Sequence, residues 1–161
     1  MSFKTVLSFT LWMMVVVAPG CAVSPIYQEG TLPGLAVLPK KSDWRAVGSL
    51  QDIRYAIDGD INTAALNGAA AEEATITIDL GRACMFNTVV IDHGRNEPAY
   101  AHSVAVLISM DGKNFTQRYS APGTRRVSTF CMPSPVLARY VRIAALAPRA
   151  GSWSVAEVYL Q

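Results

Sequence analysis

The sequence has few of the features on which most enzymes and nucleic-acid-binding proteins depend. It has two histidines, His93 and His102, so a metalloenzyme centre is not expected. It contains no G-x-S-x-G nucleophile motif, no H-E-x-x-H zinc motif and no cysteine pair with zinc spacing. The formal net charge is +2 and the basic residues are scattered, so a nucleic-acid partner is not expected either. The sequence therefore predicts a protein that is not an enzyme.

Residues 1–21 have the pattern of an export signal, with a positive charge followed by an apolar stretch and small residues. Pro19 and Gly20 interrupt this stretch before the roughly 20 apolar residues that a membrane span needs. Its end, "APGC", resembles the lipobox of bacterial lipoproteins, which predicts lipidation of Cys21. We therefore expect a membrane-anchored lipoprotein that faces the periplasm or the cell surface. Ordinary cleavage after Ala22, which would give a secreted protein, is the alternative.

The remaining cysteines are Cys84 and Cys131. An even pair in an oxidising compartment favours a disulfide, so we predict a bridge between them. Two separate buried thiols are the alternative.

The mature chain divides into a tether and one folded domain. Residues 22–41 are rich in proline and glycine and show no sustained period, which is typical of a flexible tether. Residues 42–161 form a single domain of a size that can bury a core.

Within this domain, apolar residues alternate with polar ones, which predicts half-buried strands. The residues expected on buried faces are Ala74, Ile76, Ile78, Leu80, Val104, Val106, Ile108 and Met110. Further strands are predicted at 87–93, 125–132, 138–146 and 153–160, and Asp111-Gly112 predicts a tight hairpin into a strand at 114–120. No segment shows a helical stripe, so the fold class is all-β, an antiparallel β-sandwich or jelly roll.

The acidic segment "AIDGDINT", residues 56–63, lies between predicted strands. It is not an EF-hand, because Thr63 stands where that loop needs glycine. A turn in which Asp58 caps its own backbone and a calcium site of another kind both remain open, and the residues alone favour the turn.

Five segments in order, "AIDGDINT", "ITIDLG", "SMDGKNF", "ARYVRI" and "WSVAEVYL", resemble the discoidin domain, also called the coagulation factor five/eight type C domain, and the related bacterial family 32 carbohydrate-binding modules. The resemblance covers about 42–161. It implies a galactose-binding-like jelly roll of two packed antiparallel sheets.

The resemblance also implies a structural calcium ion, and this reverses the preference for a simple turn. The ligands it implies are Ala56, Asp58, Asp60, Thr63, Ala156 and Glu157. A carboxylate in the apolar strand "WSVAEVYL" needs a partner, because an unpaired buried charge is costly. A salt bridge from Arg54 to Glu157, with no metal, is the alternative.

The candidate ligand-binding residues are Arg95, Asn96 and Trp153, to which the resemblance points, together with His93. A Trp153 ring could stack on a sugar while Arg95 and Asn96 orient its hydroxyl groups. The alternatives place Trp153 in the core and pair Arg95 with Asp92 or Glu97, and they make His93 a surface or strand-edge residue. Sugar-binding relatives often carry Trp-His where this sequence has Ala65-Leu66, so galactose specificity is not expected.

The sequence thus predicts an exported, lipid-anchored, non-catalytic module that recognises a carbohydrate or another envelope component. The first alternative is a protein-interaction or scaffolding lipoprotein that has lost sugar binding. A hydrolase that uses the acidic segment is a third, weaker hypothesis.

Overall fold

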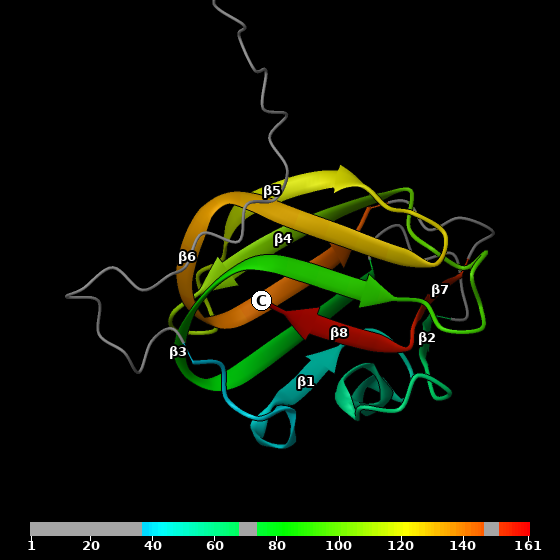
Figure 1. Cartoon of the computed structure of the whole chain (residues 1–161), viewed down its shortest axis with the longest axis horizontal. Coiled ribbons are helices and arrows are strands. Elements are labelled where there is room, and N and C mark those ends of the chain that lie inside the picture. The colour runs from blue at the N-terminus through cyan, green and yellow to red at the C-terminus, as the bar shows by residue number, and fades with distance from the viewer. Residues whose placement is uncertain (1–36, 68–73, 147–151) are drawn as a thin grey trace, which may run out of the picture.

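The computed structural model describes residues 37–67, 74–146 and 152–161, and within them nearly all regular structure is strand. The elements in chain order are η2 (Lys41–Asp43), β1 (Arg45–Gly48), η3 (Ile53–Ile57), β2 (Ala65–Asn67), β3 (Ala74–Asp92), β4 (Ser103–Ser109), β5 (Thr116–Pro122), β6 (Val127–Ala145), β7 (Trp153–Val155) and β8 (Glu157–Leu160), where η marks a 3₁₀ helix (Figure 1). The all-β antiparallel prediction is confirmed. No helical segment in this described part has the length and hydropathy of a membrane span.

Two long curved strands, β3 and β6, build both layers of the sandwich (Figure 1). The first part of β3 pairs with β1 and with the end of β6, whereas its second part pairs with β8 and with the beginning of β6. The prediction split β3 into 74–81 and 87–93, and β6 into 125–132 and 138–146. In the structure each pair is one strand. A register shift between Asp79 and Cys84 and a positive φ of 79° at Gly81 mark where β3 bends.

The predicted alternation describes the core well. The expected inward residues of β3 and β4 are at most 7% exposed: Ala74, Ile76, Ile78, Leu80, Val104, Val106 and Ile108. Met110 is the exception and is 55% exposed. Since β4 ends at Ser109, the period no longer applies to Met110, and that prediction is wrong.

The predicted hairpin between β4 and β5 exists, but its loop is longer than the two-residue turn that Asp-Gly favours. The Oδ1 atom of Asp111 accepts hydrogen bonds from the backbone N–H groups of Lys113 at 2.9 Å and Asn114 at 2.8 Å. These hydrogen bonds hold the pKa of Asp111 far below its ordinary value. The carboxylate therefore closes a wider loop than the prediction allowed.

The C-terminal segment forms two short strands where one was predicted. β7 pairs with β2, and β8 pairs with the second part of β3. The break falls at Ala156, whose N–H donates to the backbone carbonyl of Asp92 at 2.8 Å. This break brings Glu157 beside the acidic loop that follows η3.

Candidate functional site

The acidic loop follows η3 and is closed by its own side chains. The Asp58 carboxylate accepts from the N–H of Asp60 at 2.9 Å and from the hydroxyl of Thr63 at 2.8 Å. Asp60 accepts in turn from the backbone and side-chain N–H groups of Asn62, at 2.9 and 2.8 Å. These hydrogen bonds from Asn62 lower the pKa of Asp60. The loop is therefore the Asx-type turn that the sequence left open.

Glu157 joins the acidic loop to the end of the chain, as the resemblance implied. Its side chain is fully buried, and its Oε2 atom accepts from the N–H of Gly59 at 2.6 Å. Its Oε1 atom lies 2.5 Å from the Nζ atom of Lys41. Lys41, and not Arg54, is thus the salt-bridge partner that the structure gives Glu157. Ala56 and Ala156 are fully buried on either side of this junction.

These residues do not fit a resident calcium ion as they are arranged. Both oxygens of Glu157 and both oxygens of Asp58 are engaged by donors of the protein itself, and one of those donors is a cation. A calcium ion needs several oxygens directed at one point. Among the residues that the structure describes, no three His, Cys, Asp or Glu side chains are placed to share a metal ion. The calcium site stays a prediction that this arrangement does not favour.

A shallow polar hollow lies beside the acidic loop, at the end of β3. Its volume is about 300 Å³, and its lining residues are Ile61, Asn62, Asp92, Gly94, Arg95, Glu97 and Arg126. The Nη2 atom of Arg95 donates to Oδ1 of Asn62 at 2.8 Å, and both residues are exposed. Asn96 is exposed next to Arg95. The predicted ligand residues Arg95 and Asn96 therefore lie together on the surface.

Gly94, which lines this hollow, lies in close contact with the acidic loop and with the β7–β8 junction. It has a φ of +59°, which favours glycine, and a Cβ atom there would lie 2.8 Å from Cβ of Ala156 and 2.9 Å from the carbonyl oxygen of Ile61. Three segments distant in sequence thus meet at one residue. Substitution of Gly94 would force them apart.

Two predicted ligand residues lie in the core, so that prediction is wrong for them. His93 is 1% exposed, and its ring nitrogens lie 2.6 Å from the carbonyl oxygen of Ser154 and 3.3 Å from Oγ of Ser128. Burial lowers the pKa of His93. Trp153 is fully buried, so its ring cannot stack on a ligand at the surface. Both side chains sit on segments that end at the rim, but they face inward.

The predicted disulfide between Cys84 and Cys131 is also wrong. Cys84 is a buried free thiol that pairs across the sheet with Ala138, whereas Cys131 pairs with Thr88. Cys84 and Thr88 are four residues apart on β3, a separation of roughly 13 Å along a strand, so Cys84 lies far from the Cys131 that pairs with Thr88. A disulfide requires Cα atoms closer than about 7 Å. Cys21, the predicted lipidation site, lies outside the described residues.

Sequence reasoning missed Lys41, which it assigned to the tether, and Asn62 and Arg126 in the hollow. The position of Asn62, two residues after Asp60 in an acidic loop, was a usable signal. Nothing in the sequence around Lys41 or Arg126 indicates that Lys41 would lie at Glu157 or that Arg126 would line the hollow.

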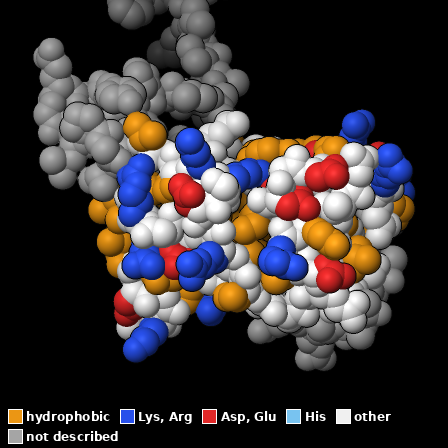
Figure 2. Space-filling model, turned by 90° about the horizontal axis from the view of Figure 1, so that it is seen from below, with side chains coloured by type: hydrophobic (Ala, Val, Ile, Leu, Met, Phe, Trp, Pro, Cys, Tyr) orange, Lys and Arg blue, Asp and Glu red, His pale blue; other side chains and the backbone are white. Residues whose placement is uncertain are grey.

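Charged side chains of both signs are interspersed over the face that Figure 2 shows. The hollow has the same mixture, with two guanidinium groups and two carboxylates among its lining residues. Such a surface offers hydrogen-bond donors and acceptors together, which suits a neutral polyhydroxylated ligand better than a highly charged one.

Comparison with solved structures shows that this fold is similar to that of several carbohydrate-binding modules. The family 32 carbohydrate-binding module of C. perfringens NanJ, solved in complex with galactose, has a TM-score of 0.67 and 20% identity, over 75% of this chain and 95% of that one. A module from Clostridium perfringens in complex with GalNAc-beta-1,3-galactose has a TM-score of 0.66 and 20% identity, over 75% and 96%. The chitosan-binding module 1 of a Paenibacillus sp. IK-5 chitosanase/glucanase has a TM-score of 0.66 and 22% identity, over 74% and 95%.

No curated protein matches the chain. The family model of the F5/8 type C domain matches residues 40–158, which include β1 to β7, the first two residues of β8, the acidic loop and Glu157. This chain belongs to the F5/8 type C domain family.

Proposed function

We propose that this chain is a non-catalytic module that binds a carbohydrate in the hollow beside Arg95. The observation that carries the proposal is the pairing of exposed Arg95 and Asn62 in a polar hollow at the end of β3, with exposed Asn96 next to Arg95 in the chain. The fold it shares with galactose- and chitosan-binding modules supports the same class of ligand.

The chemistry of the hollow suits sugar hydroxyl groups. Guanidinium groups donate, carboxylates accept, and the Asn62 amide can do both, so neighbouring hydroxyls of one ring can be paired in a fixed orientation. No aromatic side chain is among the lining residues, so stacking adds nothing to the affinity. We therefore expect dissociation constants of about a millimolar, which corresponds to about −4 kcal/mol.

The test is a glycan array with the soluble domain, followed by titration of the best ligand into the wild type and into Arg95→Ala. Loss of a hydrogen bond to a charged donor costs about 1.5–3 kcal/mol, so affinity should fall at least about tenfold. Arg118→Ala is the matched control, because Arg118 is an exposed arginine on β5 that does not line the hollow. Equal binding by wild type and Arg95→Ala would place the sugar elsewhere.

One observation favours a second candidate, a protein-interaction or scaffolding role. The aromatic residue expected on the rim, Trp153, is buried, and Leu66 is 43% exposed where related modules often have a polar ring. Two results together would support this candidate against the first. The glycan array would show no binding, and a defined envelope protein would be captured by the wild type but not by Leu66→Asp.

We further propose that the chain is exported and anchored through lipid on Cys21, with the domain facing the periplasm or the cell surface. The support is the signal-like segment 1–21 and its lipobox-like end. Cys21→Ser should abolish acylation and release the protein from membranes. Unchanged mass and fractionation would refute the anchor.

The absence of catalysis is part of the proposal. Its support is the carbohydrate-binding, rather than hydrolytic, description of the similar structures. A panel of chromogenic glycosides should show no turnover by the wild type. Calcium is no part of the proposal, because protein donors already engage both carboxylate oxygens of Asp58 and both of Glu157.

A further inference from the structure

The buried carboxylate of Glu157 needs a positive partner in the folded protein. Its side chain is 0% exposed, at the beginning of β8, and transfer of a charge out of water is costly unless the charge is paired and hydrogen-bonded. The N–H of Gly59 satisfies one oxygen at 2.6 Å. The other oxygen faces the Lys41 ammonium group at 2.5 Å.

Lys41 is held in place by more than the ion pair. Its Nζ atom lies 3.8 Å from the centroid of the Tyr159 ring and 5.9 Å from that of Trp44, which are cation–π distances. Its backbone carbonyl accepts from the N–H of Trp44 at 3.0 Å. The Lys41 side chain is 26% exposed, so much of it is removed from water. Burial and the charges of Glu157 and Asp92 raise the pKa of Tyr159, so its ring stays neutral beneath the ammonium group.

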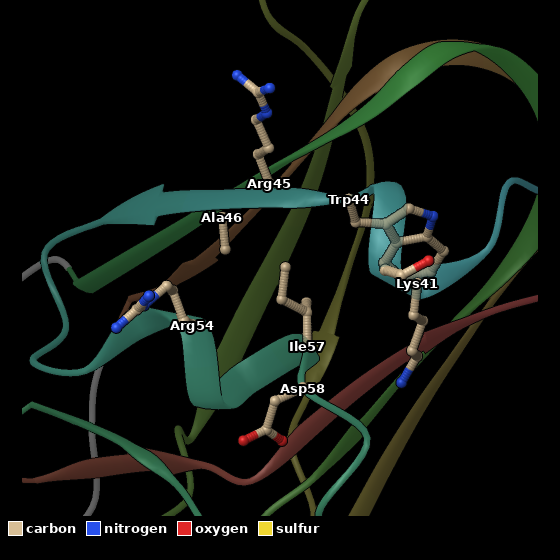
Figure 3. A pocket seen from close by; sticks show the side chains of 8 residues that line it. Lys41, Trp44, Arg45, Ala46, Arg54, Ile57 and Asp58 are labelled. Carbon is tan, nitrogen blue, oxygen red and sulfur yellow. The ribbon is translucent and has the colours of Figure 1, made fainter.

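The geometry around the ammonium group explains why no second cation is needed. Lys41 comes from η2, and with Trp44 and Asp58 it lines a hollow of about 390 Å³ between η2, β1 and the end of η3 (Figure 3). The Asp58 carboxylate, in the same hollow, is already satisfied by Asp60 and Thr63. A divalent ion bound to Glu157 would have to displace the ammonium group and then repel it.

We propose that the Lys41 ammonium group is the resident cation of this site, in the place where the family resemblance implies calcium. A covalently attached cation joins the beginning of the folded domain to its last strand, 116 residues later. The domain then folds and keeps its acidic loop in place without a metal ion. This inference does not depend on the proposed carbohydrate binding.

The first experiment uses the wild-type chain. Isothermal titration with calcium chloride should show no saturable binding, and thermal unfolding should give the same Tm in calcium and in chelator, because only a ligand of the folded state shifts Tm. Saturable binding of one calcium ion, with a Tm that rises in calcium, would overturn the inference.

The second experiment removes the ammonium group. Lys41→Met keeps the alkyl stem and should lower Tm by roughly 5–10 °C, because it leaves Glu157 buried and unpaired. The matched control is Lys40→Met, an exposed neighbour whose loss should leave Tm unchanged. In a Glu157→Gln background, Lys41→Met should have at most a third of its effect, since the carboxylate charge is gone. Equal Tm values for Lys41→Met and Lys40→Met would overturn the inference, as would an undiminished effect in the Glu157→Gln background.

Discussion

Replacement of Trp153 separates a core role from a ligand-binding role. The indole is fully buried on β7, where Trp153 pairs with Asn67 of β2. Truncation of a buried tryptophan to alanine costs about 3–5 kcal/mol. For a domain of this size that corresponds to a fall in Tm of roughly 10–20 °C. A ring that stacked on a sugar at the surface would leave Tm nearly unchanged on truncation.

The Trp153→Phe variant tests the contribution of the indole N–H group. The indole N–H of Trp153 has no hydrogen-bond partner among the described residues, and a buried unpaired donor costs about 1–3 kcal/mol. Phenylalanine removes that donor but leaves a small cavity, which costs about 1–2 kcal/mol. The two effects oppose each other, so we expect Trp153→Phe to melt within a few degrees of the wild type.

Circular dichroism melts of the two Trp153 variants, with titration of the best array ligand, provide the assay. The core role predicts that Trp153→Ala is strongly destabilised and that Trp153→Phe binds ligand as the wild type does. A Trp153→Ala variant that melts normally but no longer binds sugar would refute the burial argument and restore the stacking role.

Three further predictions follow from the buried and strained positions. Burial lowers the pKa of His93 in the folded state, so the unfolded chain takes up this proton first as pH falls. The Tm of the wild type should therefore decrease as pH falls below about 6.5, and His93→Gln should remove this pH dependence. A wild-type Tm that does not change with pH below about 6.5 would contradict the prediction. Burial raises the pKa of the Cys84 thiol, so iodoacetamide should modify Cys84 only after unfolding, and rapid alkylation of the native protein would count against its burial. Gly94→Ala should lower Tm more than Gly59→Ala, since both glycines have positive φ but only Gly94 meets neighbouring atoms; equal effects would mean that strain alone matters.

The fold could be predicted because its signal is local and repeated. The alternation at Ile76, Ile78 and Leu80 predicts a buried strand face whatever the length of the strand, and all three side chains are fully buried. The length of β3 could not be predicted, because its continuation past Gly81 depends on pairing with the distant β6 and β8. The hydrophobic pattern of one segment does not indicate which remote segment will pair with it.

The site was predictable in its segments but not in its orientations. The resemblance brought the acidic loop and Glu157 together correctly, since it compares ordered motifs along the whole chain. It could not show that His93 and Trp153 face inward, because a residue at the end of a strand can turn to either side. The role of Lys41 could not be predicted, because it depends on the carboxylate of Glu157, which lies 116 residues later in the sequence.

The identity of the cation at Glu157 bears on the hollow as well as on stability. Glu157 fixes the start of β8, and Ala156 just before it lies against Gly94, which precedes Arg95 in the hollow. A metal ion would make this chain of contacts sensitive to calcium, whereas a lysine side chain cannot be removed by a chelator. Carbohydrate binding should therefore be the same in calcium and in chelator. Lys41→Met should weaken it, because the rim loses the contact that positions its loops.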